Sequence, residues 1–363
     1  MRQHMKIAAI AASVFLAAAA PAVGVDAATP NDTARFLAGM PPSAESPLTP
    51  LTKDPAWQQH AKFFDYVFRQ LEQRQLSKIR AWARTNLNAS RPTVFYMFSG
   101  PDFLYADAFY SKATTYVLSG LEPIGSIPNL VKVPLRKIGG TLRNVESSLN
   151  SIVRLSFFKT KNMKSDLRAG PLNGALPILY VFLVRSGKTI HDVSLVKLDE
   201  EGAADSDSDG ASDKTARGVK IVFAGGDGEA KTLYYFSTNL ENEGVNGSGF
   251  LKLFCEKLAP GDSLIKSASY LLHSDNFSRV REFLLANSAV MLQDDSGIPL
   301  SDFDPKKWRL FPFGRYLPPI AIFHRKYQSK YAELFRKARP IDFGIGYRWR
   351  PNESNLLLIV KLP

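Results

Sequence analysis

Apolar residues recur every three or four positions in several parts of the chain, which is the spacing of amphipathic helices. The first such region starts at Asp54 and Pro55, a capping residue followed by proline, and continues over two or three helices to about Thr85. A long helix is predicted between Pro134 and Ile152. Further helices are predicted from Asp102 onward and at 171–186 (broken by Pro177), 248–258, 261–273, 276–287 and 320–337.

Other stretches are short, apolar and rich in β-branched and aromatic residues, which predicts strands. Residues 93–98 and 114–118 are continuously apolar, as strands buried on both faces are. The remaining strands are predicted at 190–199, 217–224, 230–237, 289–292, 343–349 and 356–362. The sequence GGDGE between the strands at 217–224 and 230–237 indicates an antiparallel hairpin.

Short buried strands that alternate with helices predict an α/β fold: a mixed sheet with helices on both faces and an antiparallel strand extension. No stretch has the composition of a linker between two cores, so we expect one domain over 55–363. Residues 28–54 are rich in Pro, Ser, Thr and Ala and are expected to form a loosely ordered lead-in to that domain.

An acidic, low-complexity insert at 200–216 separates the first two strands of the antiparallel stretch, and its composition predicts disorder. Its aspartates begin with the spacing of a calcium loop, Asp205-x-Asp207-x-Asp209-Gly210. The twelfth position, where such a loop needs a bidentate Glu, is Ala216. The sequence therefore favours a solvated acidic loop and leaves calcium binding open.

The first 27 residues have the three-part pattern of a secretory signal peptide. Arg2 and Lys6 precede an apolar run from Ile7 to about Ala20, and Val25 and Ala27 have the spacing that signal peptidase requires. That run is short for a membrane span, and we expect no transmembrane span in the mature chain. The pattern predicts a periplasmic or secreted protein, with an uncleaved anchor as the alternative.

Composition narrows the possible chemistry. The chain has 46 Lys and Arg against 34 Asp and Glu, a net charge of +12, and a single cysteine, Cys255, that we expect to be buried. One cysteine excludes an internal disulfide and a cysteine-rich zinc site. No G-x-S-x-G, H-E-x-x-H, Walker or G-x-G-x-x-G motif is present, so the commonest hydrolase, metalloprotease and nucleotide-binding mechanisms are disfavoured. No cofactor and no metal ion are predicted.

Positive charge is concentrated near the C-terminus. Residues 306–350 contain twelve Lys and Arg against Glu333 and Asp342, interleaved with aromatic residues. Because an exported protein seldom meets nucleic acid, an anionic envelope polymer or lipid headgroups are the expected partners of this region. The alternative is a solvated basic surface around ordinary core aromatics.

Polar residues follow the predicted strands where each one ends, which is where open α/β sheets bind ligands. The carboxylates are Asp102, Glu122, Asp294 and Asp295, our candidates for catalytic residues. The candidates for ligand binding are Ser99, Asn239 and Gln293. If several converge, they could bind a ligand or carry acid–base chemistry. Each loop alone is equally well explained as a turn or helix cap.

Three stretches together, FSGPDFLYADAF at 98–109, GLEPIG at 120–125 and QDDSGIPL at 293–300, are followed by FGRY and FGIGY. With these motifs the chain resembles a group of exported bacterial proteins without an assigned activity. The resemblance implies a bacterial origin and carries over no catalytic residue.

Two functions therefore remain from the sequence. The first is an exported protein that binds a ligand or an anionic surface of the cell envelope. The alternative is an exported hydrolase with an acidic site at the carboxyl ends of the strands. The sequence leaves open whether the chain is an enzyme.

Export has a direct test. If signal peptidase cleaves after Ala27, N-terminal sequencing of the protein from its native cell will begin at Ala28. A cytosolic protein that retains Met1 would contradict this prediction.

Overall fold

The computed structural model describes residues 27–87, 90–155, 172–198, 204–206 and 216–363. Residues 1–26, which hold nearly all of the predicted signal peptide, lie outside this set, as does most of the acidic insert at 200–216.

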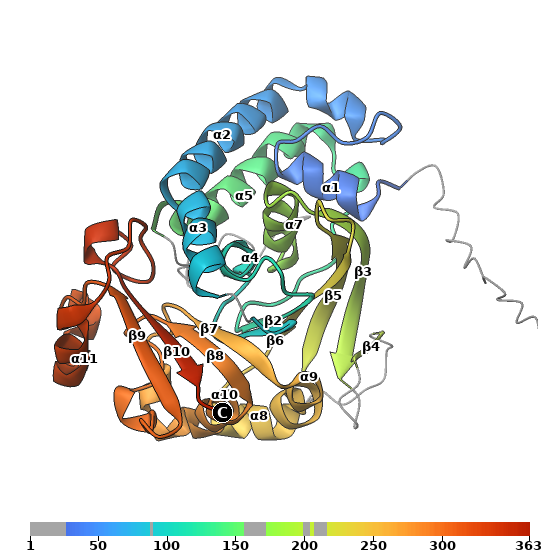
Figure 1. Ribbon diagram of the computed structural model, residues 1–363. Coiled ribbons are helices and arrows are strands. Elements are labelled where there is room, and N and C mark those ends of the chain that lie inside the picture. The colour runs from blue at the N-terminus through green and yellow to red at the C-terminus, as the bar shows by residue number, and fades with distance from the viewer. Residues whose placement is uncertain (1–26, 88–89, 156–171, 199–203, 207–215) are drawn as a thin grey trace, which may run out of the picture.

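The described residues form an α/β fold around one mixed sheet of ten strands in the order β4-β3-β5-β6-β2-β1-β7-β8-β10-β9 (Figure 1). The five central strands are parallel: β6 (Ala230–Ser237), β2 (Thr115–Gly120), β1 (Thr93–Tyr96), β7 (Gly261–Ile265) and β8 (Ser288–Gln293). The predicted mixed sheet is therefore confirmed.

Antiparallel strands extend the sheet on both sides. On one side lie β5 (Arg217–Ala224), β3 (Thr189–Leu198) and β4 (Ala204–Ser206). On the other side, β10 (Asn355–Lys361) pairs antiparallel with both β8 and β9 (Trp308–Gly314). Because β8 and β9 are each antiparallel to β10, they run in the same direction.

Two hydrophobic cores lie on the two faces of the sheet, because side chains alternate along each strand. Val94 and Tyr96 enter one core, and Phe95 enters the other. The first core is covered by α1 (Pro30–Leu37), α2 (Pro55–Leu71), α3 (Ser77–Asn86), α4 (Phe103–Phe109), α5 (Leu135–Leu155) and α7 (Leu176–Arg185). The second is covered by α8 (Asn242–Ser248), α9 (Glu256–Leu258), α10 (Ser278–Asn287) and α11 (Ser329–Leu334), on the opposite side of the sheet in Figure 1.

The lead-in expected at 28–54 is instead part of the first core, and that prediction is wrong. Thr29 caps α1 by accepting a hydrogen bond from the Asp32 amide, and Phe36 and Leu37 are fully buried. The Asp32 carboxylate in turn accepts hydrogen bonds from the amide and hydroxyl of Ser43. Small and polar residues here serve as caps and turns, which composition alone does not separate from disorder.

The predicted helix at 261–273 is also wrong. Residues 261–265 form β7, which lies between β1 and β8 in the centre of the sheet. The strand is short and carries buried Asp262 and Ser263 among its apolar residues, so its apolar periodicity is weak. Asp262 is held by the amides of Arg91 and Val290, which explains a carboxylate inside a strand.

The C-terminal third differs from prediction in three further places. Residues 343–349 form no strand but a loop with one isolated bridge between Ile345 and Arg348. The neighbour of β10 is β9, a strand that the sequence pattern did not predict. The helix predicted at 320–337 is divided into α11 and short 3-10 turns at Ala321–Lys326 and Phe335–Lys337.

Three other expectations fall within the described residues. The described part of the acidic insert includes Ala204–Ser206, which is strand β4 rather than disordered. Cys255 is buried as expected, and burial raises the pKa of its thiol. In the described parts of the chain, none of the helices combines the length and apolarity that crossing a bilayer requires.

Candidate functional site

The parallel strands reverse their direction of winding between β1 and β7. Numbered by their order along the chain, they stand in space as third, second, first, fourth and fifth. This is the order of doubly wound α/β sheets, which bind ligands beyond the carboxyl ends of the strands on either side of the reversal. The loops after β1, β2, β6 and β7 are therefore the expected walls of a site.

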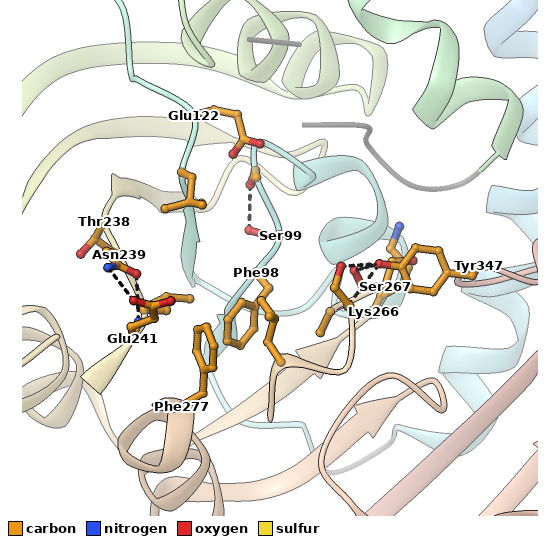
Figure 2. Close-up of a pocket in the computed structure, with 17 residues that line it drawn as sticks. Phe98, Ser99, Glu122, Thr238, Asn239, Glu241, Lys266, Ser267, Phe277 and Tyr347 are labelled. Carbon is orange, nitrogen blue, oxygen red and sulfur yellow. Dashed lines mark hydrogen bonds between the residues drawn. The ribbon is translucent and has the colours of Figure 1, made fainter. Parts of the chain in front are cut away.

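A cavity of about 300 Å³ lies at this position (Figure 2). Each of the four loops contributes to its wall, together with Phe277 before α10 and Tyr347 from the C-terminal loop. The residues that line it are Phe98, Ser99, Gly100, Gly120, Leu121, Glu122, Thr238, Asn239, Leu240, Glu241, Lys266, Ser267, Ala268, Ser269, Leu271, Phe277 and Tyr347. The wall thus combines apolar side chains with polar and charged ones, and such convergent polar groups fix the orientation of a ligand in small-molecule sites.

A buried ion pair joins the loops after β1 and β7, and one of its members, Lys266, lines the cavity. Lys266 Nζ lies 2.8 Å from Asp102 Oδ2, and the two residues are only 3 % and 1 % exposed. Tyr96 donates its hydroxyl to the same carboxylate at 2.8 Å, and the ammonium also lies 4.0 Å from the centre of the Tyr105 ring. Burial raises the pKa of Asp102, while Lys266 acts to lower it.

The loop after β7 has an unusual backbone. Ser267, Ser269 and Tyr270 have φ values of 54°, 53° and 55°, a region that residues other than glycine rarely adopt. Surrounding groups hold this conformation: the Ser267 amide donates to Asp294 at 2.8 Å, and Tyr347 donates to the Ser267 carbonyl at 2.8 Å. The Ser269 hydroxyl lies 2.8 Å from the Tyr347 hydroxyl.

The adjacent carboxylates Asp294 and Asp295 are buried behind this loop and have separate partners. Asp294 accepts hydrogen bonds from the amides of Ser267 and Ser296 and from the Ser296 hydroxyl. Asp295 accepts from the Tyr270 hydroxyl and, at 2.9 Å, from the side-chain amide of Asn355. Burial raises the pKa of both, that of Asp294 to about 6 with a further contribution from Asp295.

Two carboxylates line the cavity, and Glu122 is buried whereas Glu241 is exposed. Glu122 is 4 % exposed, and Tyr235 donates its hydroxyl at 2.8 Å to the Glu122 backbone carbonyl, with Oε2 farther away at 3.4 Å. Within the described residues no cation pairs with it. A buried carboxylate without a cation gains most from hydrogen-bond donors that a ligand brings.

The sequence candidates are thus divided between two layers. Glu122, Ser99 and Asn239 line the cavity. Asp102, Asp294 and Asp295 are buried in contacts with neighbouring loops, and Gln293 bonds the backbone of Ile298 on both sides of its amide.

Lys266, Ser267 and Tyr347 were missed as members of this site. Lys266 and Ser267 follow β7, a strand in a region predicted to be the helix 261–273, and Tyr347 lies in a segment predicted to be the strand 343–349. The pair Pro260-Gly261 before Leu264 and Ile265 is the local signal that could have indicated a strand start.

Three serines line the cavity, but in the described structure none of their hydroxyls is hydrogen-bonded to a carboxylate or a histidine, the pairing that activates a serine nucleophile. The Ser99 hydroxyl donates to the Gly100 carbonyl at 2.7 Å. The Ser267 Oγ atom is buried and has no partner in the described structure. The covered ranges also contain no cluster of three or more potential metal-binding side chains.

Comparison of the chain with protein-family models, with curated proteins and with solved structures finds no match in any of the three. The case for a function therefore depends on the site itself.

The ion pair between Asp102 and Lys266 yields a stability prediction. Replacing Lys266 by Met leaves the carboxylate buried without its cation, and we expect a loss of about 3–5 kcal/mol in the free energy of unfolding. The double variant K266M/D102N should recover part of that loss. Urea unfolding of the two single variants and the double variant measures the coupling.

The pH dependence provides the check. Without Lys266, the folded-state pKa of Asp102 rises further above its unfolded value, so the folded protein takes up a proton at acidic pH. The deficit of K266M relative to the parent should then shrink as the pH falls from about 8 to about 5. A deficit that does not change with pH, or strictly additive single effects, would contradict the pairing.

Proposed function

We propose that the chain is an exported bacterial protein that binds a small ligand in the cavity at the carboxyl ends of β1, β2, β6 and β7. One observation carries the proposal: Glu122 lies in the cavity wall, is 4 % exposed and has no cationic partner among the described residues. The ligand supplies the missing donors. It is polar, rich in hydroxyl or amino groups, and neutral or cationic.

The rest of the wall supports this proposal. The Ser267 Oγ atom offers a second unused polar group at the β7 side of the cavity, and the loop that carries it is held by Asp294 and Tyr347. A site whose loops are fixed before binding loses little entropy when the ligand arrives. The exported-hydrolase alternative would need a base beside Ser99 or Ser267.

Thermal unfolding with a panel of ribonucleosides, monosaccharides, polyols and amino acids tests the proposal. A member present at about 100 times its Kd should add ~2.7 kcal/mol to the free energy of unfolding. Glu122→Gln should weaken binding of that compound by about tenfold or more, because a hydrogen bond to a charged group is lost.

The matched control is Glu229→Gln, an exposed carboxylate in the hairpin between β5 and β6, which should bind as the parent does. A panel without any stabilising member, or a hit that is unaffected by Glu122→Gln, would refute the proposal. Turnover of an ester substrate that is lost in Ser267→Ala would establish the hydrolase instead.

A second proposal concerns the basic region 306–350, which we infer to contact anionic lipid headgroups. Arg315, Arg325, Lys326 and Lys330 are exposed, and none of them forms an ion pair in the part of the chain described here. Beside them Ile322 is 77 % exposed and Tyr327 is 50 % exposed. Exposed apolar and aromatic side chains among cations favour a bilayer interface over a soluble polymer.

This basic segment lies next to the cavity. Its part after β9 begins at the edge of the sheet where β8 also ends, and Gln328 donates its side-chain amide to the Asp295 carbonyl at 2.9 Å. The Phe323 ring lies 5.0 Å from the ring of Tyr347, a residue of the cavity wall. A lipid surface bound here would therefore lie beside the ligand site.

Vesicle sedimentation tests the lipid contact. The protein should bind vesicles of anionic phosphatidylglycerol and not those of zwitterionic phosphatidylcholine. The triple variant R325E/K326E/K330E should bind at least about 100-fold more weakly, since each lost cation removes about 1 kcal/mol of attraction and each new carboxylate adds repulsion.

The control is the triple variant K53E/K62E/R69E. It makes the same charge change at three exposed positions, one just before α2 and two in α2, the helix that covers the first core. An equal loss in both triple variants would show that net charge alone drives binding. That result would contradict a docking site at 306–350.

A further inference from the structure

We infer that the ligand of the cavity is a ribonucleoside without a 5′-phosphate, whose ribose 2′- and 3′-hydroxyls donate to the Glu122 carboxylate. This inference rests on the proposed ligand-binding function and names the chemical class of that ligand. Four features of the described residues lead to it: the position of Glu122 in the fold, the two glycines beneath it, the occupied end of α4 and the apolar side chains beside it.

The position of Glu122 is set by the first β–α–β unit of the sheet. β1 leads through a short loop with Gly100 into α4, and β2 returns parallel to β1 and ends two residues before Glu122. In the dinucleotide-binding members of this sheet class, whose loop carries a glycine-rich motif that this chain lacks, an acidic residue about 20 positions further on binds the ribose hydroxyls. Here Glu122 follows Gly100 by 22 positions.

Two glycines make room for the carboxylate. A Cβ atom on Gly120 would lie 2.4 Å from Glu122 Oε2 and 2.9 Å from the Cα of Gly100. Gly100 itself has φ of 55°, and a Cβ there would lie 3.3 Å from the same Oε2. The two loops can therefore approach each other only as glycines, and between them they fix the carboxylate at the cavity wall (Figure 2).

In nucleotide-binding folds the phosphate lies at the N-terminus of the helix after β1, and here the Asp102 carboxylate occupies that place. Asp102 places its own carboxylate at the N-terminus of α4, where Oδ1 accepts from the Tyr105 amide at 3.2 Å. Pro101 in the same loop has no backbone N–H to offer. Lys266, the cationic residue that lines the cavity, is paired with Asp102. A second negative group here would meet the carboxylate, so the site disfavours phosphorylated nucleotides.

The apolar surface next to Glu122 suits a base. Leu121 and Leu240, from the loops after β2 and β6, line the cavity together with Thr238. Two apolar side chains can sandwich a planar ring while the Thr238 hydroxyl bonds its edge. The cavity volume of about 300 Å³ is at the small end for ligand sites, which suits one nucleoside rather than a dinucleotide.

Calorimetric titration of the full mature chain tests the inference. Adenosine, guanosine, cytidine and uridine are compared with the 2′-deoxynucleosides and with the 5′-monophosphates. At least one ribonucleoside should bind. Its 2′-deoxy and its 5′-phosphate forms should each bind about tenfold or more weakly, because one loses a donor to Glu122 and the other brings a charge to Asp102.

Glu122→Gln should remove the preference for the ribose over the deoxyribose form, while Glu229→Gln should keep it. This preference is a ratio measured on one protein, so it does not depend on the variant's stability. Equal binding of ribose and deoxyribose forms, or tighter binding of the monophosphate, would overturn the inference. Binding of a sugar or an amino acid through Glu122, without any nucleoside binding, would leave the proposed function standing and refute the nucleoside.

Discussion

The buried ion pair between Asp102 and Lys266 is the interaction on which the site depends. The two residues follow β1 and β7, the strands between which the winding of the sheet reverses. At such a point the loops diverge, and an opening is left between them. A paired charge in this opening requires both partners to stay in place, because either one alone would be buried without compensation. The hydroxyl of Tyr96 and the ring of Tyr105 complete its surroundings.

Contacts next to this ion pair fix the conformation of the loop after β7, which forms part of the cavity wall. Three residues after β7 have positive φ values, which costs about 1–3 kcal/mol each and persists only when the surroundings impose it. Asp294 holds the amide of Ser267, and Tyr347 holds its carbonyl. Both come from parts of the chain distant in sequence, so the loop conformation is a product of the completed sheet.

Much of the fold could be predicted because it depends on local patterns. Continuous apolar runs gave β1 and β2, and strong helical periodicity gave α2 and α5. β7 could not be predicted, since Asp262 and Ser263 are polar and their satisfaction depends on Arg91 and on Val290 in another strand. The same limit applies to the site: strand-end loops indicated the edge, but the division between buried and ligand-facing carboxylates depends on partners far away in sequence.

Four carboxylates at one edge of a sheet have different roles because their partners differ. Asp102, Asp294 and Asp295 are satisfied by a lysine, amides and hydroxyls of the protein, so they stabilise loops. Glu122 has only a distant hydroxyl near its carboxylate in the described structure. The chain as a whole is strongly basic, with a net charge of +12. Long-range attraction therefore favours anionic partners at the outer surface, whereas the cavity wall itself disfavours anions. The two properties separate the proposed partners by depth: a negatively charged surface contacts the exterior, and a neutral, donor-rich molecule occupies the cavity.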